Sequence, residues 1–194
     1  MNRRSYALGR LGTFISDDLE AGYRSGECAH DVRIARVLAI IEVLFNVPFG
    51  INDYVFQRDT QLFYMLMAVR FVNVCIGALV YVRMPSLTSA RARDRMLLVF
   101  AAVIATTSIP IYMSRPPGFG GPLATVLLII VAWALILPAS FRYQLAAVSC
   151  LVVSFVTAYA LQGPAGTAAL VSTAPVLTLG VVLTLVGSLS RHRS

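Results

Sequence analysis

The sequence predicts an all-α, polytopic membrane protein with six transmembrane helices and both termini in the cytoplasm. Hydrophobic residues make up 58% of the 194 residues and charged residues 13%, with a mean hydropathy of +0.76. Ordinary soluble domains contain about 45–50% apolar and about 25% charged residues. The apolar residues form six long runs, and the basic residues gather between alternate runs. Together these observations exclude a soluble globular domain.

Each of the six runs has at least about 18 mainly apolar residues, the number that a helix needs to cross roughly 30 Å of hydrocarbon at about 1.5 Å per residue. The predicted spans are residues 34–53, 62–83, 96–114, 122–139, 143–161 and 167–188. The connections are short, and several contain turn-forming Gly and Pro. Short connections make consecutive helices antiparallel neighbours. The polar and basic segment 82–95 is expected to be a cytoplasmic linker.

The segment before the first span is polar, with no short apolar core after Arg3 and Arg4. It therefore does not resemble a cleavable signal peptide, and the first apolar run is interpreted as an uncleaved anchor. Apolar residues within 11–23 recur at helical spacing and predict a short amphipathic helix. That helix could lie on lipid headgroups or pack on a partner. We expect residues 1–32 to form a cytoplasmic segment, 33–189 the transmembrane domain, and 190–194 the start of a cytoplasmic linker to a missing output domain.

The orientation follows from the arginines. With a cytoplasmic amino terminus, thirteen of the 16 basic residues lie on the inner side, Arg58 and Arg115 lie in outer loops, and Arg70 lies within a span. This asymmetry is typical of the positive-inside rule. All 16 basic residues are arginines, so chemistries that need lysine, such as a P-loop or a Schiff base, are excluded.

Neither the histidines nor the cysteines form a recognisable site. His30 and His192 flank the apolar region, and three cysteines show no ligand spacing. We therefore expect no metal site, no cofactor and no intramembrane haem. An integral-membrane enzyme is also disfavoured, because the sequence shows no metal cluster and no Ser-His-Asp set.

Glu42 and Arg70 are the two formal charges deep within the predicted spans, where each costs about 2.5–3.5 kcal/mol at a helix centre. On adjacent antiparallel helices they reach similar depths, at about 1.5 Å per residue. We predict a Glu42–Arg70 ion pair, assisted by Asn46 and Asn73. The pair could be structural, tying the first two helices together, or Arg70 could hold an anionic ligand.

Hydroxyl groups cluster in the third run around Pro110. Such groups usually bond to their own backbone or to a neighbouring helix. If they converge, they would outline an outer-half pocket for a small or amphipathic ligand. The residues concerned are Thr106, Thr107, Ser108 and Tyr112, with Tyr64, Tyr159, Ser172 and Thr173 on other helices. The candidate ligand-binding set is Arg70, Glu42, Asn46, Thr106, Thr107 and Tyr112.

The last span contains small residues that allow close helix packing. Gly180 and Gly187 are seven positions apart and share a face, and Pro175 can kink the helix. We predict that these three residues transmit a signal along the span. The charged exit SLSRHRS suggests continuation into a further domain.

Five stretches resemble the six-helix membrane domains that precede bacterial nucleotide cyclases, both diguanylate cyclases of the GGDEF type and class III adenylate cyclases. They are DLEAGYR (18–24), VRIARVLAI (32–40), FGINDYV (49–55), LMAVRF (66–71) and FRYQLA (141–146). The resemblance implies a dimeric sensor or anchor in the bacterial inner membrane whose last helix continues as a signalling coiled coil. It implies no ligand-binding residues. The chain has no GG[DE]EF motif, so by itself it is not expected to make a cyclic nucleotide.

The sequence therefore favours a membrane sensory and dimerisation module, with a plain anchor as the simpler form. The expected partners are the lipid bilayer, a second copy of the chain and a small or lipophilic ligand, and no nucleic acid. The alternative is a subunit of a small oligomeric transporter or channel. That alternative would need ionisable residues along a path and an internal repeat, whereas the last four spans hold no charge and show no convincing repeat of the first.

Overall fold

The computed structural model describes residues 28–58, 60–116, 121–136 and 139–193, and every regular element in this part of the chain is helical. The elements are α2 (Cys28–Gln57), α3 (Gln61–Arg83), the short 3-10 helix η1 (Met84–Ser86), α4 (Ala90–Met113), α5 (Gly121–Ile136), α6 (Phe141–Leu161) and α7 (Pro164–Arg193). Helices α2, α3, α4, α6 and α7 are long and apolar enough to cross a membrane, and α5 is a shorter apolar helix. The predicted all-α fold of membrane-spanning length is confirmed. The predicted amphipathic helix lies outside the described residues.

Each predicted span lies mainly within one helix, but the helices extend beyond the apolar runs. The largest difference concerns segment 82–95, which was expected to be a polar linker. Here η1 follows α3 directly, and α4 begins at Ala90 because the Ser89 side chain caps it by accepting a hydrogen bond from the Ala92 amide at 3.1 Å. Polar residues therefore form the first turns of a helix, as N-cap chemistry allows.

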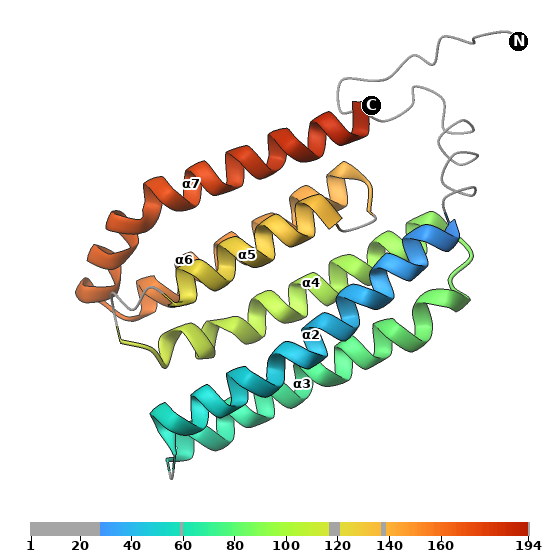
Figure 1. The fold of residues 1–194 in the computed structure, drawn as a ribbon. Coiled ribbons are helices and arrows are strands. Elements are labelled where there is room, and N and C mark those ends of the chain that lie inside the picture. Colours follow the sequence, from blue (N-terminus) through green and yellow to red (C-terminus); the bar gives the residue numbers. More distant parts are fainter. Residues whose placement is uncertain (1–27, 59, 117–120, 137–138, 194) are drawn as a thin grey trace, which may run out of the picture.

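The helices form an antiparallel bundle (Figure 1). α2 packs on α3, α3 on α4, and α4 on α6, while α5 and α7 pack on each other and on α6. In their most apolar windows α6 is 44% buried and α7 11%, so α6 is central and α7 peripheral. The beginning of α2 and the end of α7 lie at the same end of the bundle (Figure 1). We call this the proximal end, and the end near Gln57, Arg115 and Gln162 the distal end.

Apolar side chains fill most of the proximal half of the bundle, and the buried Arg93, Asp94 and Gln144 lie near its proximal end. Phe100 of α4 stacks on Trp133 of α5 with ring centroids 5.9 Å apart. Gly77 allows α3 to approach α2 closely, because a Cβ at this position would lie 2.9 Å from Val43 Cγ2. The buried residues of this half include Ala35, Leu38, Ala39, Val80, Met84, Leu97, Phe100 and Ala101. The distal half differs, because its charged and amide side chains lie around a cavity.

Candidate functional site

A cavity of about 170 Å³ lies inside the distal half, between α2, α3, α4 and α5. Helices α2 and α5 stand on opposite sides of it and form no substantial packed interface with each other. Its wall combines aromatic and aliphatic side chains with amides, hydroxyls and charges. The lining residues are Glu42, Phe45, Asn46, Phe49, Asn52, Arg70, Asn73, Ile104, Ser108, Ile111, Tyr112, Arg115, Thr125 and Ile129. A mainly apolar cavity with a few convergent polar groups is typical of a small-molecule site.

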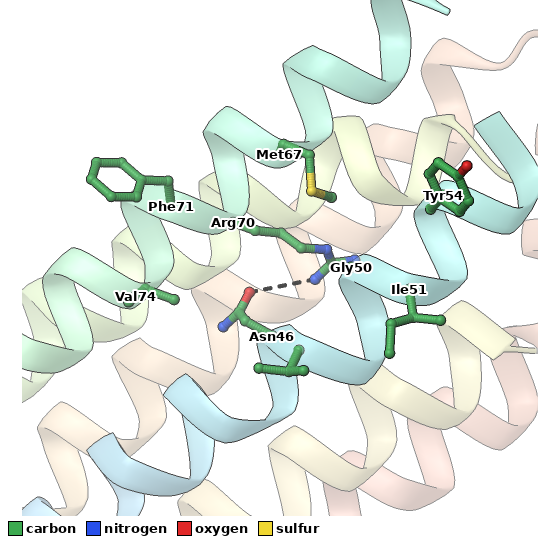
Figure 2. A pocket seen from close by; sticks show the side chains of 9 residues that line it. Asn46, Gly50, Ile51, Tyr54, Met67, Arg70, Phe71 and Val74 are labelled. Atoms are coloured by element: carbon green, nitrogen blue, oxygen red, sulfur yellow. Dashed lines mark hydrogen bonds between the residues drawn. The ribbon is translucent and has the colours of Figure 1, made fainter. Parts of the chain in front are cut away.

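Four of the six candidate ligand-binding residues line this cavity: Glu42, Asn46, Arg70 and Tyr112. Asn46 connects two of them. Its Nδ2 donates to the Glu42 backbone oxygen at 2.8 Å and to Glu42 Oε1 at 3.2 Å, and its Oδ1 accepts from Arg70 Nη1 at 3.4 Å. Figure 2 shows Arg70 reaching from α3 toward Asn46 on α2. The amide thus stands between the two charges.

The ion pair of Arg70 is formed with Asp53 and not, as predicted, with Glu42. Arg70 Nε donates to Asp53 Oδ2 at 2.5 Å. The physical reason is that α2 continues to Gln57, so Asp53 is a helical residue that faces α3 and not the end of a span. The Asp53 side chain is completely buried, and the Arg70 side chain is 8% exposed.

Asp53 also binds Arg115, which follows α4. Arg115 Nη2 donates to Asp53 Oδ1, so one carboxylate receives two guanidinium groups. Arg70 lies over the Phe49 ring and Arg115 over the Phe56 ring, at 5.3 and 5.0 Å from the centroids. Such cation–π contacts further stabilise desolvated guanidinium groups. The Asp53–Arg70–Arg115 cluster joins α2, α3 and the end of α4.

Two glutamine side chains hold the end of α4 in place. Gln57 Nε2 donates to the Ser114 backbone oxygen at 3.1 Å. Gln162 Nε2, at the end of α6, donates to the backbone oxygens of Tyr112 and Arg115 at 3.0 and 3.2 Å. The last carbonyls of a helix have no partner within the helix, and these amides supply one. They thereby fix the position from which Arg115 enters the cavity.

The hydroxyl cluster of α4 converges only in part. Thr107 Oγ1 lies 2.6 Å from Asn73 Oδ1 and also bonds to the Val103 oxygen at 2.8 Å, whereas Thr106 is exposed and bonds to the Ala102 oxygen. Ser108 is buried, and its hydroxyl donates to the Ile104 oxygen at 2.7 Å. The Tyr112 hydroxyl is buried near Ser108 without a hydrogen bond of standard geometry.

The hydroxyl residues on other helices do not join the cavity. Tyr64 is 67% exposed, and Tyr159 packs against Phe155 with ring centroids 4.6 Å apart. Ser172 and Thr173 bond to backbone oxygens of their own helix at 2.8 and 3.0 Å. A pocket does form in the distal half, but these four side chains are not part of its wall.

The three residues predicted to transmit a signal all lie in α7. The helix continues through Pro175, which is exposed. Gly180 faces α5 closely, because a Cβ at this position would lie 2.6 Å from Leu127 Cδ2. The surroundings of Gly187 lie outside the described residues. Close packing is therefore observed at Gly180, where small residues let helices approach.

A second, shallower depression of about 420 Å³ lies on the outer face of α2 and α3. Figure 2 shows its wall, which includes Gly50, Met67 and Phe71. Arg70 and Asn46 line this depression as well as the cavity, so they separate the two. The depression is almost entirely apolar and suits a lipid chain rather than a polar ligand.

The sequence reasoning did not single out Asp53, Arg115 or Asn52 as site residues. A signal for Asp53 was available, since Glu42, Asn46, Asp53 and Gln57 recur at four- and seven-residue spacing on one face of a helix. No comparable pattern marks Arg115, because it follows the last turn of α4. Among the described residues, no group of three or more His, Cys, Asp or Glu side chains could hold a metal ion.

Comparison of the chain with protein-family models, with curated proteins and with solved structures finds no match. The function is therefore argued from the cavity and the helices around it.

Proposed function

We propose that the chain is a membrane sensory module. A small ligand binds in the distal cavity and biases the bundle between two packings, and α7 passes the change to a cytoplasmic signalling domain. The resemblance of the sequence to cyclase membrane domains suggests a nucleotide cyclase as the output and a homodimer as the working form. A ligand shifts such an equilibrium only by its difference in affinity for the two packings.

The observation that carries the proposal is the placement of charge around a cavity. Asp53, Arg70 and Arg115 are buried together, and two of them are arginines that share one carboxylate. Well-packed apolar residues would join the helices with equal or greater stability than buried ion pairs. Ionisable residues within membrane helices are typical of functional sites. A plain anchor has no need for this arrangement.

The apolar layer below the cavity, which separates it from the buried Arg93, Asp94 and Gln144 near the proximal end, favours a binding site over a transport path. A transporter or channel needs polar or ionisable groups along a route through the membrane. In the described part of the bundle, the cavity is confined to the distal half, and the side chains below it include Leu38, Leu97 and Phe100. A ligand in this cavity would contact α2, α3, α4 and α5 together and would not pass through the bundle.

The test uses Tyr112→Phe, which removes a buried hydroxyl that lacks a standard hydrogen bond. Loss of such a group leaves stability unchanged or improves it, so any change in signalling reflects the site. The full chain is fused after Ser194 to a diguanylate cyclase catalytic domain through linkers of several lengths, and cyclic di-GMP is measured in cells. Tyr64→Phe is the matched control, because Tyr64 is 67% exposed and outside the cavity.

We expect Tyr112→Phe to change cyclase output severalfold at equal expression, whereas Tyr64→Phe leaves it unchanged. Equal output from the parent fusion and from Tyr112→Phe and Asn52→Ala fusions would refute the sensory role. Equal output together with solute uptake by reconstituted vesicles would identify a transporter instead.

A further inference from the structure

We infer that the cavity ligand is a small apolar monocarboxylate, held by Arg115 at the distal end of the cavity. This inference rests on the proposed function, because it assumes that the cavity is a ligand site. Three independent features carry it: a buried guanidinium with one nitrogen that has no hydrogen-bond partner, the apolar wall, and the cavity's size.

The guanidinium group of Arg115 has one nitrogen, Nη1, without a hydrogen-bond partner. Arg115 lines the cavity, its side chain is 5% exposed, and this nitrogen is buried, while Nη2 binds Asp53. Buried polar groups nearly always have a partner, and an orphaned charged donor is costly. A carboxylate is the group that best matches a guanidinium, with short charge-assisted hydrogen bonds.

The arrangement of the charges favours an anion at the distal end only. Two guanidinium groups, Arg70 and Arg115, contact one carboxylate there, Asp53. Glu42 lies on the cavity wall toward the proximal side and contacts Asn46. A bound carboxylate would complete the pairing at the Arg115 end and would be repelled by Glu42. Electrostatics therefore orient the ligand with its anionic group distal.

The rest of the wall suits an apolar body. Phe45, Phe49 and Ile111 contribute rings and aliphatic groups, and the Tyr112 hydroxyl is a second donor without a standard partner. The volume of about 170 Å³ is close to the roughly 150 Å³ of an engineered cavity that holds benzene. Benzoate and short aliphatic acids fit this volume, whereas nucleotides and sugar phosphates do not.

The helices around the cavity leave a route by which such a ligand would enter from the lipid. α2 and α5 both line the cavity but pack on other helices and not on each other, so the ligand would pass between them. An apolar acid partitions into a bilayer and reaches this route directly, which a highly charged metabolite cannot do.

The experiment measures benzoate binding to the purified full chain in lipid nanodiscs, by calorimetry and by the shift in Tm. Benzamide and benzylammonium serve as neutral and cationic probes of the same shape. We expect benzoate to raise Tm and the other two to leave it unchanged. Glu42→Gln should tighten benzoate binding, and Arg115→Gln should weaken it by about tenfold or more. Arg58→Gln is the control, because Arg58 is exposed and outside the cavity.

If Arg115→Gln fails to fold, two other variants test the inference. Tyr112→Phe should weaken benzoate binding, and Glu42→Gln should tighten it. Three outcomes would overturn the inference. They are benzamide binding with the same affinity as benzoate, benzylammonium binding more tightly than benzoate, and no shift in Tm with any of the three probes. The proposed function has a separate readout: if Tyr112→Phe still alters cyclase output while benzoate does not bind, the ligand class is wrong and the sensory role stands. If Tyr112→Phe and Asn52→Ala both leave cyclase output unchanged, the proposed function itself fails, whatever binds.

Discussion

Replacing Asp53 by asparagine removes the charge on which two buried arginines depend. Asp53 is fully buried and accepts hydrogen bonds from Arg70 and Arg115, whose side chains are 8% and 5% exposed. Breaking a buried ion pair by removing one partner costs about 3–5 kcal/mol. Asparagine keeps one neutral acceptor oxygen, so we expect the lower end, about 3 kcal/mol. At about 1.4 kcal/mol per tenfold change, the folding equilibrium would shift by more than a hundredfold.

The assay is reversible unfolding in mixed micelles, followed by the fluorescence of Trp133. This is the single tryptophan of the chain, and it is 6% exposed and stacked on Phe100. Arg58→Gln serves as an exposed-charge control. Adding Arg115→Gln to Asp53→Asn removes one of the two cations that Asp53→Asn leaves without a partner. The free energy of unfolding of the double variant should therefore fall by less than the sum of the two single decreases. A loss below about 1 kcal/mol for Asp53→Asn, as for an exposed ion pair, would refute the reasoning.

Two further predictions test the packing of α3 against its neighbours α2 and α4. Thr107→Val should lower the free energy of unfolding by about 0.6–1.7 kcal/mol, the range for hydrogen bonds between membrane helices, because it removes the bond to Asn73 at 2.6 Å. Thr106→Val, which loses only a bond within its own helix, should cost less in the same unfolding assay, and equal losses would contradict the interhelical role. Gly77→Ala should destabilise the bundle by about 1–3 kcal/mol, because its Cβ would lie 2.9 Å from a methyl group of α2. Gly50→Ala, whose nearest neighbour would be 3.7 Å away, should be tolerated, and a comparable drop in Tm for both would rule out close packing as the cause.

The sequence was sufficient to predict the helices, because length and hydropathy determine which segments can cross a bilayer. It was less informative about where helices begin and end. Ala90 to Arg95 is polar enough to suggest a linker, yet it is helical because Ser89 caps it. The fourth span was expected to cover residues 122–139, and the structure describes α5 over Gly121–Ile136, while residues 137 and 138 lie outside the described part of the chain.

The sequence predicted which helices contribute polar residues to the candidate site, but not which residue forms the ion pair with Arg70. Depth arguments correctly brought Glu42, Asn46 and Arg70 to one cavity, because antiparallel neighbours with similar depths must meet. The partner of Arg70 was wrong, because Asp53 was taken as the end of a span although its spacing from Asn46 places it on the same face. Arg115 was counted only as a loop charge, since its inward direction depends on Gln57 and Gln162.

The side-chain amide of Gln162 connects the wall of the cavity to the start of the last helix. It binds the backbone that carries Arg115, and the next residue is Gly163, whose φ of 76° forms the turn into α7 at Pro164. A shift of the α4 terminus would act on this amide contact and on the turn beside it. The first residue of α7 lies two positions after the side chain that holds the cavity wall in place.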